Sequence, residues 1–214
     1  MAALQGLTEE RFLRLRIQLS ERIGSRRFSH TLGVEEEIIR LGNVFLPADI
    51  ARLRIAALLH DITKEWSAEE QLSYCRRHAL PLNDLEIATP RVLHAKTGAH
   101  VAKAEFSAWV DPEILHAIEF HTMGGFGMTL FDELLYLADY IEPTRTYPDC
   151  VALRRMFWEG LEGAPSKETH LHNTIIFALK GTIAELTEKH IPVFPKTYEA
   201  LSYLLQKVGE NSKN

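Results

Sequence analysis

Apolar residues recur along most of this chain at intervals of three and four positions, which places them on one face of an α-helix. No two neighbouring segments show the alternating apolar and polar residues of a strand pair joined by a hairpin turn. The spacing predicts helices over residues 8–24, 30–42, 50–63, 67–78, 97–106, 111–121, 131–142, 170–189 and 198–207. The sequence therefore predicts an all-α fold.

Capping residues and helix breakers set the expected ends of these helices. Thr8 and Ser67 are N-cap residues, and Glu70, three positions after Ser67, completes a capping box. Gly24 and Gly42 are expected to end the first two helices. Further boundary signals are a start at Asp111 and Pro112, a stop at Pro143, and two predicted loops over residues 80–91 and 123–128.

Composition narrows the class of protein. With 214 residues, of which 46% are hydrophobic, the chain can bury a sizeable core. Its formal charge of −5 argues against non-specific nucleic-acid binding, which needs a basic face, but allows a small anionic substrate held by a few cations or a metal. The opening MAALQGLTEERF lacks a signal segment and no apolar run is long enough for a membrane span, so we expect a cytosolic protein. Cys75 and Cys150 lie far apart and are expected to be free thiols.

Ten histidines are scattered along the chain, and their neighbours separate ordinary ones from candidates for chemistry. Four lie among polar residues and are expected to have no special role: His78, His170, His172 and His190. His100 and His116 lie inside amphipathic helices, where we expect structural or partly exposed imidazoles, either of which could border a pocket.

Three segments place ionisable groups where apolar residues surround them. The pair His60-Asp61 ends the apolar run IAALLH, and burial of both groups costs less when they coordinate a cation. The alternative is a helix end open to water. Asp139 lies within LLYLADYIE, where it either binds a metal or accepts hydrogen bonds from a buried Arg or Tyr. His30, in RRFSHTLGV, is either a further ligand or a packed imidazole.

This order of a His, an HD pair and a distant Asp on separate helices resembles the HD-domain superfamily of metal phosphohydrolases. Within it, the chain looks like the YqeK-type bis(5′-nucleosyl)-tetraphosphatases. The segments that carry the resemblance are RRFSHTLGV, AALLHDITKEW, LHAKTGAHVA, EFHTMGGFGMTLF, LADYIEPTR and IPVFPKTYEALSYLL, in the same order. It implies an HD-domain helical bundle with a C-terminal helical extension. We therefore expect one domain over residues 1–214, with a core at about 20–145 and C-terminal helices at about 168–208.

The resemblance also implies roles for individual residues. The metal ligands correspond to His30, His60, Asp61 and Asp139. His94 and His121 are expected to face the same cleft, where they bind a second metal or the substrate phosphates. The alternatives are local: His94 capping its helix and His121 bonding the glycine-rich loop. Asp61, Lys64, His94 and His121 are the expected catalytic residues.

Cations near these motifs are candidates for substrate binding. Lys64, one helical turn after His60, is expected to pair with a phosphate, and Arg27 and Arg145 are further candidates; each could instead be an ordinary surface charge. His94 and His121 complete the expected substrate-binding set. Glu65 and Glu142 are expected to be solvated charges at helix ends. Met123 and Gly125 depart from the family pattern after the fourth His, which bears on substrate preference more than on the type of reaction.

By resemblance, the reaction is symmetrical hydrolysis of a dinucleoside tetraphosphate, such as diadenosine tetraphosphate, into two nucleoside diphosphates. Mixed imidazole and carboxylate ligands suit iron, our first expectation, and also Mn, Co or Ni. Another HD-domain reaction is the nearest alternative, either a nucleotide monophosphatase or a cyclic-dinucleotide phosphodiesterase. A nucleotide sensor without turnover and a helical scaffold are alternatives from other classes. A homo-oligomer is compatible with the sequence, and no partner protein is implied.

Overall fold

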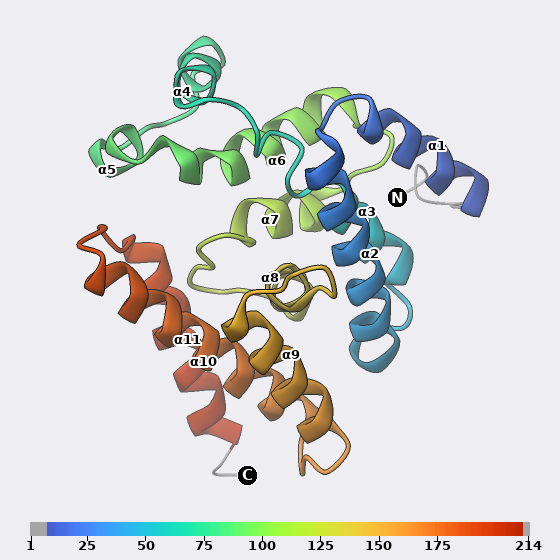
Figure 1. The fold of residues 1–214 in the computed structure, drawn as a ribbon, viewed down its shortest axis with the longest axis vertical. Helices are drawn as coiled ribbons and strands as arrows, with labels where there is room; N and C mark the ends of the chain where they lie inside the picture. The colour runs from blue at the N-terminus through green and yellow to red at the C-terminus, as the bar shows by residue number, and fades with distance from the viewer. Residues whose placement is uncertain (1–7, 212–214) are drawn as a thin grey trace.

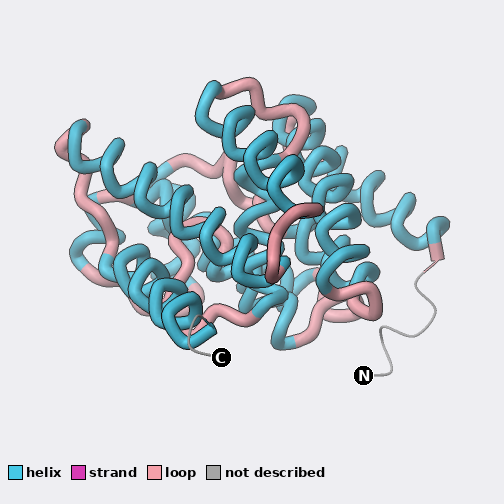
Figure 2. The backbone as a smooth tube through the Cα atoms, turned by 90° about the horizontal axis from the view of Figure 1, so that it is seen from below, coloured by secondary structure: helices cyan, strands magenta, loops and turns pink. Residues whose placement is uncertain are grey.

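A computed structural model describes residues 8–211, which form eleven α-helices and one short 3₁₀ helix (Figure 1). Within this part of the chain only helices and loops occur (Figure 2), so the predicted all-α class is confirmed. The elements are α1 (Glu9–Ser20), α2 (Ser25–Phe45), α3 (Ile50–Leu59), α4 (Ala68–Arg77), α5 (Asp84–Ala88), η2 (Pro90–Val92), α6 (Leu93–Glu105), α7 (Pro112–Phe120), α8 (Leu130–Ile141), α9 (Pro148–Leu161), α10 (Lys167–Glu188) and α11 (Pro195–Asn211). Residues 1–7, which hold most of the opening where no signal segment is expected, lie outside the described residues.

The first helix confirms its predicted start, whereas the second starts five residues before the predicted residue 30, and both predicted ends are corrected. The Thr8 side chain accepts a hydrogen bond from the main chain of α1, as expected of an N-cap. The helix stops at Ser20, and Gly24 is instead the residue that precedes α2. Gly42 does not end α2, which runs on to Phe45. A Cβ at residue 42 would lie 3.0 Å from Leu53 Cδ1, so the glycine serves close packing of α3 against α2.

Between α3 and α7 the structure is more helical than predicted. Ser67 and Glu70 form the expected capping box of α4. The segment 80–91, predicted as a loop, contains α5 and the start of η2 because Asn83 forms a second capping box with Glu86. The helix α6 also starts four residues before the predicted residue 97. By contrast, α3 is shorter than predicted, because it ends four residues before the predicted residue 63.

The C-terminal part contains one helix that the sequence reading missed. The helix α9 begins at a proline in its first turn and buries Cys150, Leu153, Phe157 and Leu161, a helical spacing that the sequence does carry. The predicted helices α10 and α11 are both present; α10 begins three residues before its predicted start, and α11 extends beyond both predicted ends. Both cysteines are buried free thiols, as expected. Among the described residues no helix combines the length and apolarity that a membrane crossing demands.

The main core lies between α2, α3, α7 and α8. The helix α2 packs against α3 and α8, while α7 packs against α3, α6 and α8. Figure 1 shows α9, α10 and α11 gathered at one end of the molecule, beyond α8. This arrangement brings the ends of α3 and α7 and the start of α6 together, beside the second turn of α2 and the last turn of α8. All the candidate ligands lie at this meeting point.

Candidate metal centre

Six side chains from five helices and their ends converge on one small region. They are His30 on α2, His60 and Asp61 directly after α3, His94 at the start of α6, His121 directly after α7 and Asp139 on α8. Five of the six residues are buried, and the side chain of Asp139 is 19% exposed. The structure therefore brings all six predicted side chains together.

Three of the imidazoles are held by main-chain carbonyls. The Nδ1 atoms of His60, His94 and His121 lie 2.6, 2.7 and 2.6 Å from the carbonyl oxygens of the residues three positions earlier. A carbonyl only accepts, so each Nδ1 carries the proton and each Nε2 presents a lone pair. Such carbonyls are open to side chains at helix ends, where the main-chain amides that would otherwise bond them are missing. The three rings are thus fixed in the tautomer that a metal ligand requires.

The Nε2 atoms and carboxylate oxygens form two overlapping groups. In the first, Asp139 Oδ1 lies 3.1 Å from His30 Nε2 and 3.8 Å from His60 Nε2. The second group is His60, Asp61 and His121, and the candidate ligand atoms of each group lie within 4.8 Å of one another. His60 belongs to both. Its Nε2 and Asp61 Oδ1 are buried and have no hydrogen-bond partner among the described residues, which is the state of atoms that fit a cation.

His94 lies at the edge of the second group. Its Nε2 is 3.2 Å from His121 Nε2, and Asp61 Oδ1 is 3.4 Å from both of these atoms. Lys64 Nζ and Thr122 Oγ1 also reach His94 Nε2, at 2.9 and 2.8 Å. Because Lys64 Nζ and Thr122 Oγ1 already meet the lone pair of this ring, a metal at His94 has to displace them.

Burial keeps two of these imidazoles neutral. It lowers the pKa of His60, and together with the charge of Lys64 it lowers the pKa of His94 to about 3. A neutral imidazole is the form that binds a metal. Both rings are therefore ready to act as ligands at any pH near neutrality.

The carboxylates stay ionised although they are shielded from water. Burial alone would raise the pKa of Asp61, but the positive charges and hydrogen-bond donors around it hold it well below its ordinary value. Likewise, Arg145 and His30 hold the pKa of Asp139 well below its ordinary value against the effect of burial. Ionised acids beside neutral imidazoles are the donor set that divalent transition metals bind.

Both acids are tied to arginines. Arg27 Nη1 donates to Asp61 Oδ2 at 2.6 Å, and Arg145 Nη2 donates to Asp139 Oδ1 at 2.6 Å. Arg145 also donates from Nε to the main-chain oxygen of Asp139 at 2.6 Å. These arginines are half-buried parts of the site rather than ordinary surface charges. Lys64 is exposed, but its ammonium reaches the site through His94.

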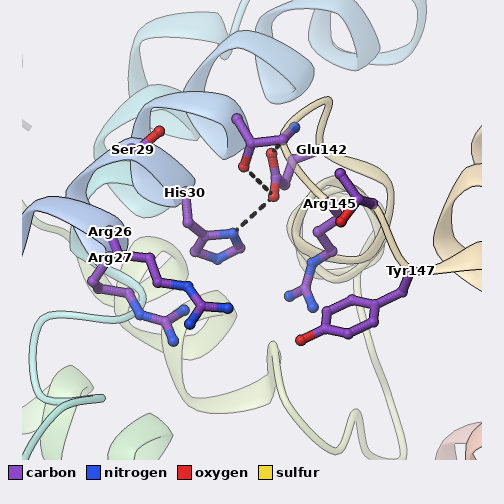
Figure 3. Close-up of a pocket in the computed structure, with 9 residues that line it drawn as sticks. Arg26, Arg27, Ser29, His30, Glu142, Arg145 and Tyr147 are labelled. Carbon is purple, nitrogen blue, oxygen red and sulfur yellow. Dashed lines mark hydrogen bonds and ion pairs between the residues drawn. The ribbon is translucent and has the colours of Figure 1, made fainter.

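A cavity of about 470 Å³ opens beside His30. Figure 3 shows Arg26, Arg27 and Arg145 directing their guanidinium groups toward this opening, with Tyr147 on the wall opposite α2. Sequence reasoning missed Arg26 and Tyr147, although both adjoin the motifs that it used. Three guanidinium groups around one opening suit a ligand with several phosphates.

Glu142 is the clearest correction to the site. The sequence reading made it a solvated charge at a helix end, but it is only 1% exposed, and its Oε1 lies 3.0 Å from His30 Nδ1. Glu65 is exposed, as expected, and accepts a hydrogen bond from the main chain of Gly24. Gly125 is one of the two residues that depart from the family pattern. A Cβ at this position would lie 2.5 Å from the Phe120 ring, so close packing accounts for the glycine.

The sequence profile of the HD domain matches residues 27–144, which include all six converging side chains. The chain belongs to the HD-domain family. It is 34% identical over 187 residues to "Bis(5′-nucleosyl)-tetraphosphatase, symmetrical" of Bacillus subtilis (strain 168), covering 87% of this chain and 94% of that protein. A protein of the same name from Staphylococcus aureus (strain NCTC 8325 / PS 47) is 32% identical over 183 residues, covering 86% of this chain and 89% of that protein.

A solved structure supports the same placement. The crystal structure of a "predicted HD superfamily hydrolase involved in NAD metabolism" from Clostridium acetobutylicum superposes with a TM-score of 0.80 at 29% identity. The match covers 92% of this chain and 97% of the other, so it extends well beyond the residues of the HD-domain match. An HD domain that carries these two His and Asp groups implies a divalent metal.

Proposed function

We propose that this HD-domain protein is a metal-dependent hydrolase that cleaves dinucleoside tetraphosphates, diadenosine tetraphosphate among them, symmetrically into two nucleoside diphosphates. The observation that carries the proposal is the pair of His and Asp groups sharing His60, set beside a cavity edged by three arginines. Support for the substrate comes from the relatives named as symmetrical bis(5′-nucleosyl)-tetraphosphatases, which align with 84–87% of the chain.

We assign the metal to His30, His60, Asp61 and Asp139, and we assign His94 and His121 to a second metal or to the substrate phosphates. Iron is the first candidate, and Mn, Co and Ni suit the same donors. A bound divalent cation supplies an acidified water and positive charge for the phosphoryl oxygens. The buried position of the ligands favours this chemistry, because low local polarity strengthens every charge interaction.

The protein's own residues bind and orient the polyphosphate. Arg27 and Arg145 already donate hydrogen bonds to Asp61 and Asp139, so their guanidinium groups are held in place beside the proposed metal. In the proposed reaction they pair with the charged oxygens of the reacting phosphate. Lys64 adds a mobile positive charge next to His94. In the proposed reaction, a water oxygen bonds to an inner phosphorus while the bridging P–O bond on the opposite side breaks. One water proton ends on the released diphosphate, which is a good leaving group.

We also propose that residues 1–214 act as one domain, with the core at about 20–145 and the C-terminal helices at about 168–208. A buried network links the two parts: Glu133 on α8 contacts His172 of α10 at 3.0 Å and Lys207 of α11 at 2.7 Å. A chain cut after residue 145 should therefore aggregate or unfold. A folded, soluble 1–145 fragment that binds metal would contradict this assignment.

Hydrolysis in oxygen-18 water tests the reaction. The protein, supplied in turn with Fe²⁺, Mn²⁺, Co²⁺ and Ni²⁺, should convert diadenosine tetraphosphate to ADP alone, with label in one of each two ADP molecules. His60→Ala and Asp139→Ala should stop turnover, whereas His78→Ala, which changes an exposed imidazole, should not. AMP with ATP as products would refute symmetrical cleavage. Tight binding without turnover under all four metals would instead favour a nucleotide sensor.

A further inference from the structure

Glu142 is a buried carboxylate immediately after α8, and it is not one of the candidate metal ligands. It accepts hydrogen bonds from the main-chain amide of Thr144 at 2.6 Å and from Thr144 Oγ1 at 2.8 Å. Its third partner is His30 Nδ1, at 3.0 Å. With 1% of the residue exposed, the carboxylate is buried in the wall between α2 and α8, behind the imidazole and away from the metal side. Figure 3 shows this contact from the cavity.

His30 differs from the other imidazoles in its position along a helix. His60, His94 and His121 stand at helix ends, where a main-chain carbonyl holds Nδ1. His30 is the sixth residue of α2, inside the helix, where the carbonyls behind it bond the amides of the next turn. Its Nδ1 therefore needs a side-chain acceptor, which Glu142 provides from another helix.

Gly33 makes room for this acceptor. A Cβ at residue 33 would lie 2.3 Å from Glu142 Oε2 and 3.2 Å from the methyl group of Thr144. Glycine inside a helix is less favourable than alanine, so its place one turn after His30 calls for a reason. The close approach of the carboxylate is that reason. The motifs SHTLG and IEPT thus fit each other as a pair.

We propose that Glu142 is a positioning residue for the metal centre, and that Gly33 is glycine so that this carboxylate can reach His30. The carboxylate keeps a proton on Nδ1, so that Nε2, the nitrogen 3.1 Å from Asp139 Oδ1, is the one left to bind the metal, and it makes the imidazole a stronger donor. This inference rests on the proposed metal-dependent function, and it concerns metal binding before any substrate is present.

Metal titration of three variants tests the inference. Glu142→Ala should weaken binding of Mn²⁺ by about 10- to 100-fold, the usual effect of losing a carboxylate behind a ligating imidazole. Glu142→Gln keeps an oxygen that can accept from Nδ1, so it should recover part of the affinity. Gly33→Ala should weaken binding because its methyl group displaces the carboxylate. The double variant, Gly33→Ala with Glu142→Ala, should lose no more than Glu142→Ala alone, since both changes break one contact.

Matched controls separate positioning from general loss of structure. Glu36→Gln removes an exposed acid from the same helix, α2, and Gly181→Ala fills open space at an exposed helical glycine on α10. Both should bind Mn²⁺ as the wild type does. Nitrogen NMR of histidine-labelled, metal-free protein reports the tautomer at about pH 10, where the imidazole is neutral, because the effect of burial is outweighed by hydrogen bonds to Asp139 and Glu142, which raise the pKa of His30 to about 9. His30 should carry its proton on Nδ1 in the wild type and in Glu142→Gln, and should lose that preference in Glu142→Ala.

The outcomes distinguish this inference from the proposed function. Wild-type affinity in Glu142→Ala, or an unchanged His30 tautomer, would overturn the positioning role whatever the substrate is. Additive losses in the double variant would overturn the pairing with Gly33. If Glu142→Ala does not fold, Glu142→Gln and Gly33→Ala carry the test. The wild type could instead bind Mn²⁺ with an affinity that depends on Glu142, yet leave diadenosine tetraphosphate intact. That result would refute the proposed substrate and leave this inference standing.

Discussion

His60 belongs to both groups of candidate ligands, so its replacement should remove the response of the protein to divalent metal. A cation that binds only the folded state stabilises it by about 2.7 kcal/mol when its concentration is one hundred times its dissociation constant. For a chain of 214 residues, each kcal/mol raises the melting temperature by about 2–4 °C. The wild type should therefore gain about 5–11 °C on saturation with metal.

Differential scanning calorimetry of metal-free and metal-loaded protein measures this gain. The quantity to compare is the shift within each variant, because His60→Ala also leaves a cavity at a fully buried residue and lowers the melting temperature without metal. The shift should vanish in His60→Ala. Asp139→Ala interrupts the first group and His121→Ala the second, so two bound metals would leave each of these variants with part of the shift.

A shift below about 1 °C in the wild type with each of Fe²⁺, Mn²⁺, Co²⁺ and Ni²⁺ would refute the metal centre, since linkage requires a larger gain at saturation. A full shift in His60→Ala would show that the cation binds elsewhere. His78→Ala is the control, because this exposed imidazole lies on α4's C-terminal end and should leave the shift unchanged.

Two further predictions concern ion pairs outside the metal centre. Burial raises the pKa of Asp111, but Arg52 and the first amides of α7 outweigh it and hold the pKa below its ordinary value of 3.8. A carboxyl group whose pKa is lower in the folded than in the unfolded protein stabilises the fold at pH values above its unfolded pKa. This stabilisation is lost as the pH falls through its folded pKa. Asp111→Asn should thus lower the urea midpoint at pH 7, and its difference from wild type should shrink below about pH 4; a constant difference would contradict this. Lys207→Met removes a partner from the fully buried Glu133, so urea unfolding should show a loss of about 3 kcal/mol, and a loss under about 1 kcal/mol would mean that the ammonium does not neutralise this acid.

The sequence indicated the candidate ligands because part of their signal is local, and the resemblance to the HD-domain superfamily supplied the rest. Ionisable residues such as His60, Asp61 and Asp139 interrupt apolar runs that must be buried, and burial of such groups in one region implies a common partner. Glu142 gave no such signal, since it follows the last turn of α8 and precedes a proline, like many exposed residues. Its hydrogen bond to His30 joins positions 112 residues apart, a pairing that no local pattern contains.

The helix α9 holds the turn after α8 in place, a role that the sequence could not indicate. It supplies none of the six converging residues, yet Arg154 in its middle donates hydrogen bonds to the main-chain oxygens of Ile141, Glu142 and Arg145. Carbonyls at the end of a helix lack partners unless a side chain or water meets them, so this arginine fixes the turn that follows α8. That turn aims Glu142 at His30 and Arg145 at Asp139. The turn that positions Glu142 and Arg145 is thus held by a side chain from a helix outside the site.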